Sequence, residues 1–136
     1  MVPARAPRWA CTVLALGWLA VGFWVWFYAT GVVRGALGDL AVVAFIAHLV
    51  GIGWNGPVLA RAGGALAFSF VVEFSQLAGA VEPDSPWWMH LFLGSTFDPW
   101  DLAHYTVSAI LAVLAELAVW GVLVRAGRDG ASVPPN

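Results

Sequence analysis

The sequence has little charge and almost no cysteine. Only 10% of its 136 residues are charged, lysine is absent, and the six basic residues are scattered arginines. A soluble domain needs a charged surface and a nucleic-acid-binding domain needs clustered cations, so both classes are excluded. The single cysteine, Cys11, cannot form a disulfide within the chain. Hydrophobic residues make up 61% of the sequence, which predicts an integral membrane protein.

Long apolar runs are abundant instead. A transmembrane helix needs roughly 20 mostly apolar residues, and four stretches of the chain qualify. We predict an all-α, polytopic integral membrane protein whose four transmembrane helices form an antiparallel bundle in a single domain, residues 1–124. The predicted spans are about residues 9–28, 37–54, 58–78 and 101–124. No Ala-x-Ala site closes the first run, so we expect an uncleaved span there.

Two further segments adjoin the last span. In "SPWWMHLFLG", Ser85 suits an N-cap, Pro86 a first helical position and Gly94 a helix end. We predict a short helix at about residues 85–94 that lies in the membrane interface or re-enters the membrane. The tail, residues 125–136, is polar and contains proline and glycine. We expect it to be disordered and cytoplasmic.

The arginines predict the orientation of the chain. With a cytoplasmic N-terminus, only Arg34 lies outside and the other arginines lie on the cytoplasmic side. This distribution satisfies the positive-inside rule, so we predict that both termini are cytoplasmic. The cytoplasmic arginines would be Arg5, Arg8, Arg61, Arg125 and Arg128.

Polar residues inside the spans gather at one level under this topology. Glu73 lies near the outer end of the third span, Asp39 at that of the second, and Asp101 at that of the fourth. Ionisable groups within spans are costly and commonly functional, so we predict a polar pocket in the outer leaflet. The candidate binding residues are Asp39, Glu73, Gln76, Asp98, Asp101, His104 and Tyr105, supported by Arg34, Ser69 and Ser108.

Helical spacing indicates which faces meet. Ser69, Glu73 and Gln76 share one face of the third span, which Ala62 and Ala65 extend. Small residues allow close helix packing and polar residues form hydrogen bonds across it. We expect this face to pack against a stripe on the fourth span, formed by Asp101, Tyr105, Ser108, Ala112 and Glu116.

Structural roles compete with functional ones at several of these positions. Asp98 suits an N-cap before Pro99, and Asp101 lies in the first turn, where the helix dipole favours a carboxylate. Asp39 is either a cap or a partner of Arg34. Glu73 is either a functional carboxylate or structural, with hydrogen bonds to its polar neighbours Gln76 or Tyr105. We expect His48 to be packed and neutral, and Glu116 to pair with Arg61 or His48.

Three segments, "GDLAVV", "EFSQL" and "GSTFDPWDLAHYT", carry a family resemblance. Together they resemble the uncharacterised small membrane proteins of the domain-of-unknown-function 2809 type, which are related to the VanZ-like family. The VanZ-like Glu and Gln, three residues apart, match Glu73 and Gln76. The VanZ-like Phe-Asp and the Asp after it match "FDPWD", residues 97–101.

The chain also departs from the VanZ-like pattern. Tyr105 stands where that family has Asn, and Ser95 and Thr96 stand where an Arg precedes Phe97. The resemblance covers roughly residues 34–116. It implies a multi-pass protein of the bacterial cytoplasmic (inner) membrane within the cell envelope.

The sequence has no catalytic signature. His-Glu-x-x-His, Gly-x-Ser-x-Gly and clustered Cys/His ligands are all missing, so we predict no catalytic residue, no metal and no cofactor. We expect an envelope protein that contacts the lipid bilayer and binds the head group of a lipid or lipid-linked intermediate. Nucleic acid is not an expected partner, and a homo-oligomer is compatible with the small-residue faces.

Other function classes stay open. One is a membrane-embedded enzyme that uses Glu73 and Asp101 as acid and base. A second is proton transport through buried Asp, Glu and His residues. A third is a structural or assembly partner in a membrane complex, since small-residue faces also suit contacts between chains.

Overall fold

The computed structural model describes residues 6–87, 89 and 96–131 of the chain. This part contains four long helices and no strand: α1 (Arg8–Tyr28), α2 (Gly31–Gly53), α3 (Val58–Leu77) and α5 (Pro99–Ala131). Each of the four is long and apolar enough to cross a membrane. The predicted all-α membrane protein with four spanning helices is therefore confirmed.

The second span begins earlier than predicted. α2 starts at Gly31 and not at about Leu37, so Arg34 lies within the helix and not in a loop. The turn between α1 and α2 has only two residues, Ala29 and Thr30. Gly31 has a φ of +57°, a backbone conformation that glycine adopts without steric cost and that permits such an abrupt turn.

The last helix is longer than predicted. α5 continues beyond Val124, through the first part of the expected tail, and ends at Ala131. This extension contains no proline, so no backbone donor is missing from the helix there. Most of the predicted short helix at about residues 85–94 lies outside the described residues, as does the end of the tail, 132–136.

Specific caps end α3 and begin α5. Past the end of α3, Gly79 has a φ of +72° and its N–H donates to the Gln76 carbonyl, while the Ala80 N–H donates to the Ser75 carbonyl, both at 2.9 Å. These bonds form a Schellman motif. At the start of α5, Asp98 Oδ1 accepts the Trp100 N–H at 2.9 Å, which confirms the predicted N-cap.

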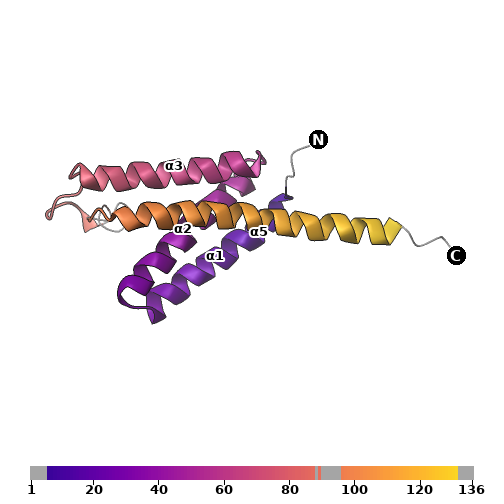
Figure 1. Ribbon diagram of the computed structural model, residues 1–136, viewed down its shortest axis with the longest axis horizontal. Helices are drawn as coiled ribbons and strands as arrows, with labels where there is room; N and C mark the ends of the chain where they lie inside the picture. The colour runs from indigo at the N-terminus through magenta and orange to yellow at the C-terminus, as the bar shows by residue number, and fades with distance from the viewer. Residues whose placement is uncertain (1–5, 88, 90–95, 132–136) are drawn as a thin grey trace.

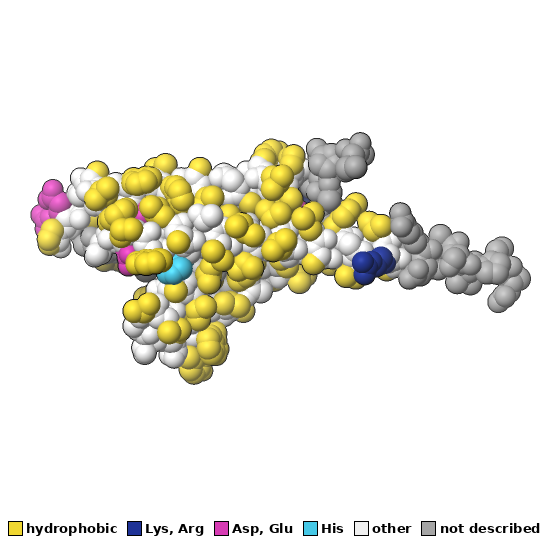
Figure 2. Space-filling model, viewed as in Figure 1, with side chains coloured by type: hydrophobic (Ala, Val, Ile, Leu, Met, Phe, Trp, Pro, Cys, Tyr) yellow, Lys and Arg dark blue, Asp and Glu magenta, His cyan; other side chains and the backbone are white. Residues whose placement is uncertain are grey.

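The helices form two pairs that cross. α3 and α5 lie side by side, and α1 and α2 make a second pair inclined to the first (Figure 1). α2 contacts all three of the other helices, whereas α1 has no contact with α3 within the described residues. Hydrophobic side chains cover much of the visible surface, and acidic side chains gather beside the turn after α3 (Figure 2). We call the end of the bundle that contains Asp39, Glu73, Asp98 and Asp101 the acidic end.

Small side chains fill the space between the helices. Their size lets the backbones approach closely, which strengthens dispersion contacts in an environment without a hydrophobic driving force. Large apolar side chains such as Phe27, Leu59 and Val122 point outward, where lipid would surround them. The buried small residues include Ala44 and Ala47 of α2, Ala62 and Ala65 of α3, and Ala109 and Ala112 of α5.

A buried ion pair joins α3 to α5 at the other end of the bundle. Arg61 and Glu116 are in direct contact, and each is only 2% exposed. The Arg61 guanidinium also donates to the Gly56 carbonyl at 3.1 Å and lies 3.5 Å from Cys11 Sγ. Arg61 or His48 was the predicted partner of Glu116, and the structure shows that it is Arg61.

Two further polar residues contact the backbone of α2. His48 is buried, and its Nδ1 lies 2.7 Å from the Ala44 carbonyl one turn earlier. Ser108 of α5 donates to the Leu40 carbonyl at 2.5 Å and accepts the Ala44 N–H at 3.0 Å. In an α-helix the Ala44 N–H donates to the Leu40 carbonyl. The Ser108 hydroxyl therefore forms hydrogen bonds with two backbone groups of α2 that would otherwise pair with each other. The Ser108 hydroxyl thus contacts α2, whereas its stripe was predicted to face α3.

Candidate functional site

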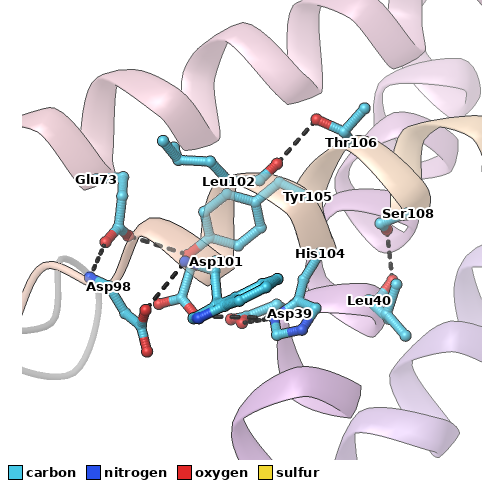
Figure 3. Close-up of polar contacts among 11 residues, drawn as sticks. Asp39, Leu40, Glu73, Asp98, Asp101, Leu102, His104, Tyr105, Thr106 and Ser108 are labelled. Carbon is cyan, nitrogen blue, oxygen red and sulfur yellow. Dashed lines mark hydrogen bonds and ion pairs between the residues drawn. The ribbon is translucent and has the colours of Figure 1, made fainter.

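Glu73 occupies the centre of the polar residues at the acidic end. Its side chain is fully buried, with 0% exposure. One carboxylate oxygen accepts the Asp98 backbone N–H at 2.8 Å, and the other accepts the Tyr105 hydroxyl at 3.3 Å (Figure 3). In a capping box, a carboxylate in the first turn of a helix accepts the N–H of the N-cap. Here Glu73 supplies that carboxylate from a neighbouring helix, and so caps α5.

A second group of polar side chains lies beside Glu73. His104 Nδ1 is 3.3 Å from Asp39 Oδ2 and 3.8 Å from Asp101 Oδ1 (Figure 3). Asp39 comes from α2, whereas Asp101 and His104 are three residues apart on α5. The three side chains are 19–29% exposed, so they lie at the edge of the bundle and not inside it. We call this the Asp39–Asp101–His104 cluster.

An open hollow adjoins Asp39 between α1 and α2. It measures about 340 Å³, and its polar lining side chains are Arg34 and Asp39. The Arg34 guanidinium lies over the Trp26 ring, 3.9 Å from its centroid. The expected pairing of Arg34 with Asp39 is wrong: among the described residues, Asp39 pairs with His104 instead. Asp39 is not a cap either, because it lies nine positions past Thr30, the N-cap of α2.

An apolar groove along the same two helices shares part of its lining with the hollow. The groove measures about 380 Å³ and is lined by aromatic and small residues from both helices. Gly22, Trp26 and Gly38 line both spaces and join them. The remaining lining residues of the groove are Trp18, Leu19, Phe23, Ala41, Val42 and Phe45.

The structure brings most of the predicted polar residues together at the acidic end. Glu73 contacts Asp98 and Tyr105, and His104 contacts Asp39 and Asp101. Gln76 is half-buried on α3, one turn from Glu73. Ser69 is buried, but its hydroxyl donates to the Ala65 carbonyl of its own helix at 3.0 Å. Within the described residues, Ser69 and Ser108 thus form their hydrogen bonds to backbone carbonyl and N–H groups and none with the carboxylates of the acidic end.

Sequence reasoning missed the contribution of α1 and the glycines that open the hollow. Gly31, Gly35 and Gly38 recur at intervals of four and three residues and line the hollow on α2. This spacing is visible in the sequence and indicates a helix face without side chains. α1 offers no comparable signal, because it is apolar on all sides.

Fold and site together define a small multi-pass helical membrane protein with a carboxylate-rich end. Comparison with known families identifies the group: residues 28–109 match a family described as "Protein of unknown function (DUF2809)". The match covers more than half of the chain, which therefore belongs to this family. The matched range includes Asp39, Glu73, Asp98, Asp101, His104 and Tyr105. No curated protein and no solved structure matches the chain.

Proposed function

We propose that this protein binds a lipid or lipid-linked amphiphile between α1 and α2, with the head group in the hollow at Arg34 and Asp39. The observation that carries this proposal is that the apolar groove and that hollow share three lining residues, Gly22, Trp26 and Gly38. An amphiphile needs both surfaces side by side, one for its chain and one for its head group. The combined space lies in the range of small-molecule sites, about 300–1,000 Å³.

The charges of the hollow favour a particular kind of head group. Arg34 offers a cation and Asp39 an anion, so a zwitterionic head group satisfies both. A head group with several phosphates does not fit, because the rest of the acidic end carries carboxylates. The tryptophan beneath Arg34 suits an interfacial position, where indole rings concentrate. Glu73 acts indirectly, since its bonds to Asp98 and Tyr105 fix α5 behind the hollow.

The proposal places the acidic end on the outer side of a bacterial cytoplasmic membrane. Its supports are the arginine distribution and the resemblance of "EFSQL" and "FDPWD" to the VanZ-like pattern. Consecutive spans then alternate in direction as an antiparallel bundle with both termini cytoplasmic. A second copy of the chain could contribute to the binding site without altering this orientation.

Cysteine labelling tests this orientation. With Cys11 replaced by Ala, a membrane-impermeant maleimide should label Glu82→Cys in intact cells. Ala126→Cys should react only after the cells are permeabilised. Both positions are exposed, Glu82 after α3 and Ala126 in the last part of α5 past the predicted fourth span, residues 101–124, so one serves as the control for the other. Labelling of Ala126→Cys in intact cells would reverse the proposed orientation.

Filling the groove tests the lipid proposal. Gly38→Leu should occupy the groove, because a Cβ at Gly38 meets no described atom within 4 Å and the variant should fold normally. Arg34→Gln removes a charge-assisted hydrogen bond worth about 1.5–3 kcal/mol, roughly a tenfold or larger loss of affinity. We expect both variants, extracted in native nanodiscs, to retain less lipid by quantitative mass spectrometry.

The matched control for this experiment is Gly17→Leu. Gly17 lies on α1 outside the groove, and a Cβ there also meets no described atom within 4 Å. This variant adds the same side chain to the lipid-facing surface without entering the groove. Equal lipid profiles in the wild-type protein and in both Gly38→Leu and Arg34→Gln would refute the proposal.

A further inference from the structure

The Asp39–Asp101–His104 cluster has the composition of a metal site. One nitrogen and two carboxylate oxygens, one from each residue, all lie within 4.8 Å of one another. Asp101 and His104 are adjacent on one face of α5, and Asp39 faces them from α2 (Figure 3). The ligands therefore come from two helices that pack together, which fixes their relative positions.

The distances fit a shared cation better than a simple ion pair. His104 Nδ1 is 3.3 Å from one carboxylate oxygen and 3.8 Å from the other. A charge-assisted N–H···O bond is shorter, about 2.7–2.9 Å, and one N–H cannot point at both oxygens. Metal–ligand bonds of about 2.0–2.2 Å place neighbouring ligands of a tetrahedral ion roughly 3.4 Å apart. The two His104–carboxylate distances lie close to that value, and the two carboxylate oxygens lie within 4.8 Å of one another.

The carboxylates in and beside the cluster would also be stabilised by a nearby positive charge. Two carboxylates face each other at the edge of an apolar bundle, where their repulsion is weakly screened. Arg34, the arginine nearest to Asp39 in the sequence, lies over Trp26. Within the described residues it forms no ion pair with the cluster. Behind the cluster, the Glu73 carboxylate adds a further negative charge. A divalent cation would neutralise this part of the protein.

We propose that Asp39, Asp101 and His104 bind a divalent first-row transition metal ion, with Zn²⁺ as the reference ion. The imidazole ligand favours such ions over Ca²⁺ and Mg²⁺, which prefer sites made of oxygen alone. Three protein ligands leave one position of a tetrahedral ion open for water or another ligand. The ion would link α2 to α5 at the acidic end. This inference does not depend on lipid binding.

Metal titration of the purified, tag-free, full-length protein tests the site. After removal of metal with a chelator, calorimetry should show saturable uptake of one Zn²⁺ per chain. Co²⁺ should give the visible absorption of a nitrogen- and oxygen-ligated ion. Asp39→Asn and His104→Gln should each lower the affinity at least about tenfold, the loss typical even of second-shell changes. The matched control is Glu82→Gln with Asp84→Asn, two exposed acids in the turn after α3.

Each outcome decides the proposal. Loss of binding in both site variants but not in the control supports it. Equal Zn²⁺ affinity in the wild-type protein and His104→Gln overturns it, as does a wild-type protein that shows no saturable uptake, a result that requires no variant to fold. The metal titration and the lipid measurement use different variants, so a failure of one proposal is distinguished from a failure of the other.

Discussion

Replacing Arg61 by Met should destabilise the protein more than any other single change considered for this chain. Arg61 and Glu116 form an ion pair in which each partner is 2% exposed. Removing one partner of such a pair leaves the other charge buried without compensation, which costs about 3–5 kcal/mol. The free energy of unfolding in mixed micelles, followed by far-UV circular dichroism during denaturing-detergent titration, should fall by that amount.

The double variant Arg61→Met/Glu116→Leu separates the loss of a partner from the value of the pair. Well-packed apolar residues can replace a buried pair with little net cost, so the double variant should recover most of the lost stability. Arg125→Met is the control, because Arg125 is exposed on α5. A double variant no more stable than Arg61→Met would show that contacts other than the pair dominate.

Gly51→Ala should produce a similar defect without changing any charge. A Cβ at Gly51 would overlap the Arg61 guanidinium and lie 2.8 Å from Cys11 Sγ. The clash is with Nη1 of Arg61, whose Nη2 contacts Glu116 and whose Nε donates to the Gly56 carbonyl, so a shift of the guanidinium away from the new methyl group disturbs these contacts. Gly53→Ala on the same helix meets no described atom within 4 Å and serves as the comparison.

Local chemistry made the start of α5 and the buried faces of α3 and α5 predictable. Asp98 was identified as an N-cap because the residue types at "DPW" satisfy the first turn of a helix without any tertiary partner. The buried faces of α3 and α5 followed from helical spacing, and Ala62, Ser69 and Glu73 are indeed buried. These features depend on residues close together in the chain, where sequence spacing translates directly into geometry.

The choice of neighbouring helix was not predictable in the same way. Helical spacing predicted that Ser108 lies on the inner face of its helix. It did not predict that this face meets α2 at Ser108, where the hydroxyl contacts the Leu40 carbonyl. The direction of a face relative to three neighbours depends on crossing angles, which the sequence does not encode locally. For the same reason the groove between α1 and α2 was missed. α1 is apolar on all of its faces, so hydrophobic periodicity does not indicate which face is buried.

Replacing Glu73 by Ala is expected to loosen the start of α5. The substitution removes the acceptors of the Asp98 N–H and the Tyr105 hydroxyl and leaves a cavity where a fully buried side chain was. Each buried donor left unpaired costs about 1–3 kcal/mol. The free energy of unfolding should fall accordingly, and the backbone amides of Asp98 and of residues 100–102 at the start of α5 should exchange with deuterium faster than in the wild-type protein.

Glu73→Gln distinguishes the loss of hydrogen bonds from the loss of charge. The amide oxygen still accepts one of the two donors in nearly the same shape, so the variant should be more stable than Glu73→Ala. Glu82→Ala is the control, because Glu82 is an exposed acid in the turn after α3. If Glu73→Ala matched the control in both stability and exchange, the carboxylate could not be capping α5. If Glu73→Gln were as damaging as Glu73→Ala, the negative charge itself would be required, and the cap would then act through its attraction to the N-terminal dipole of α5.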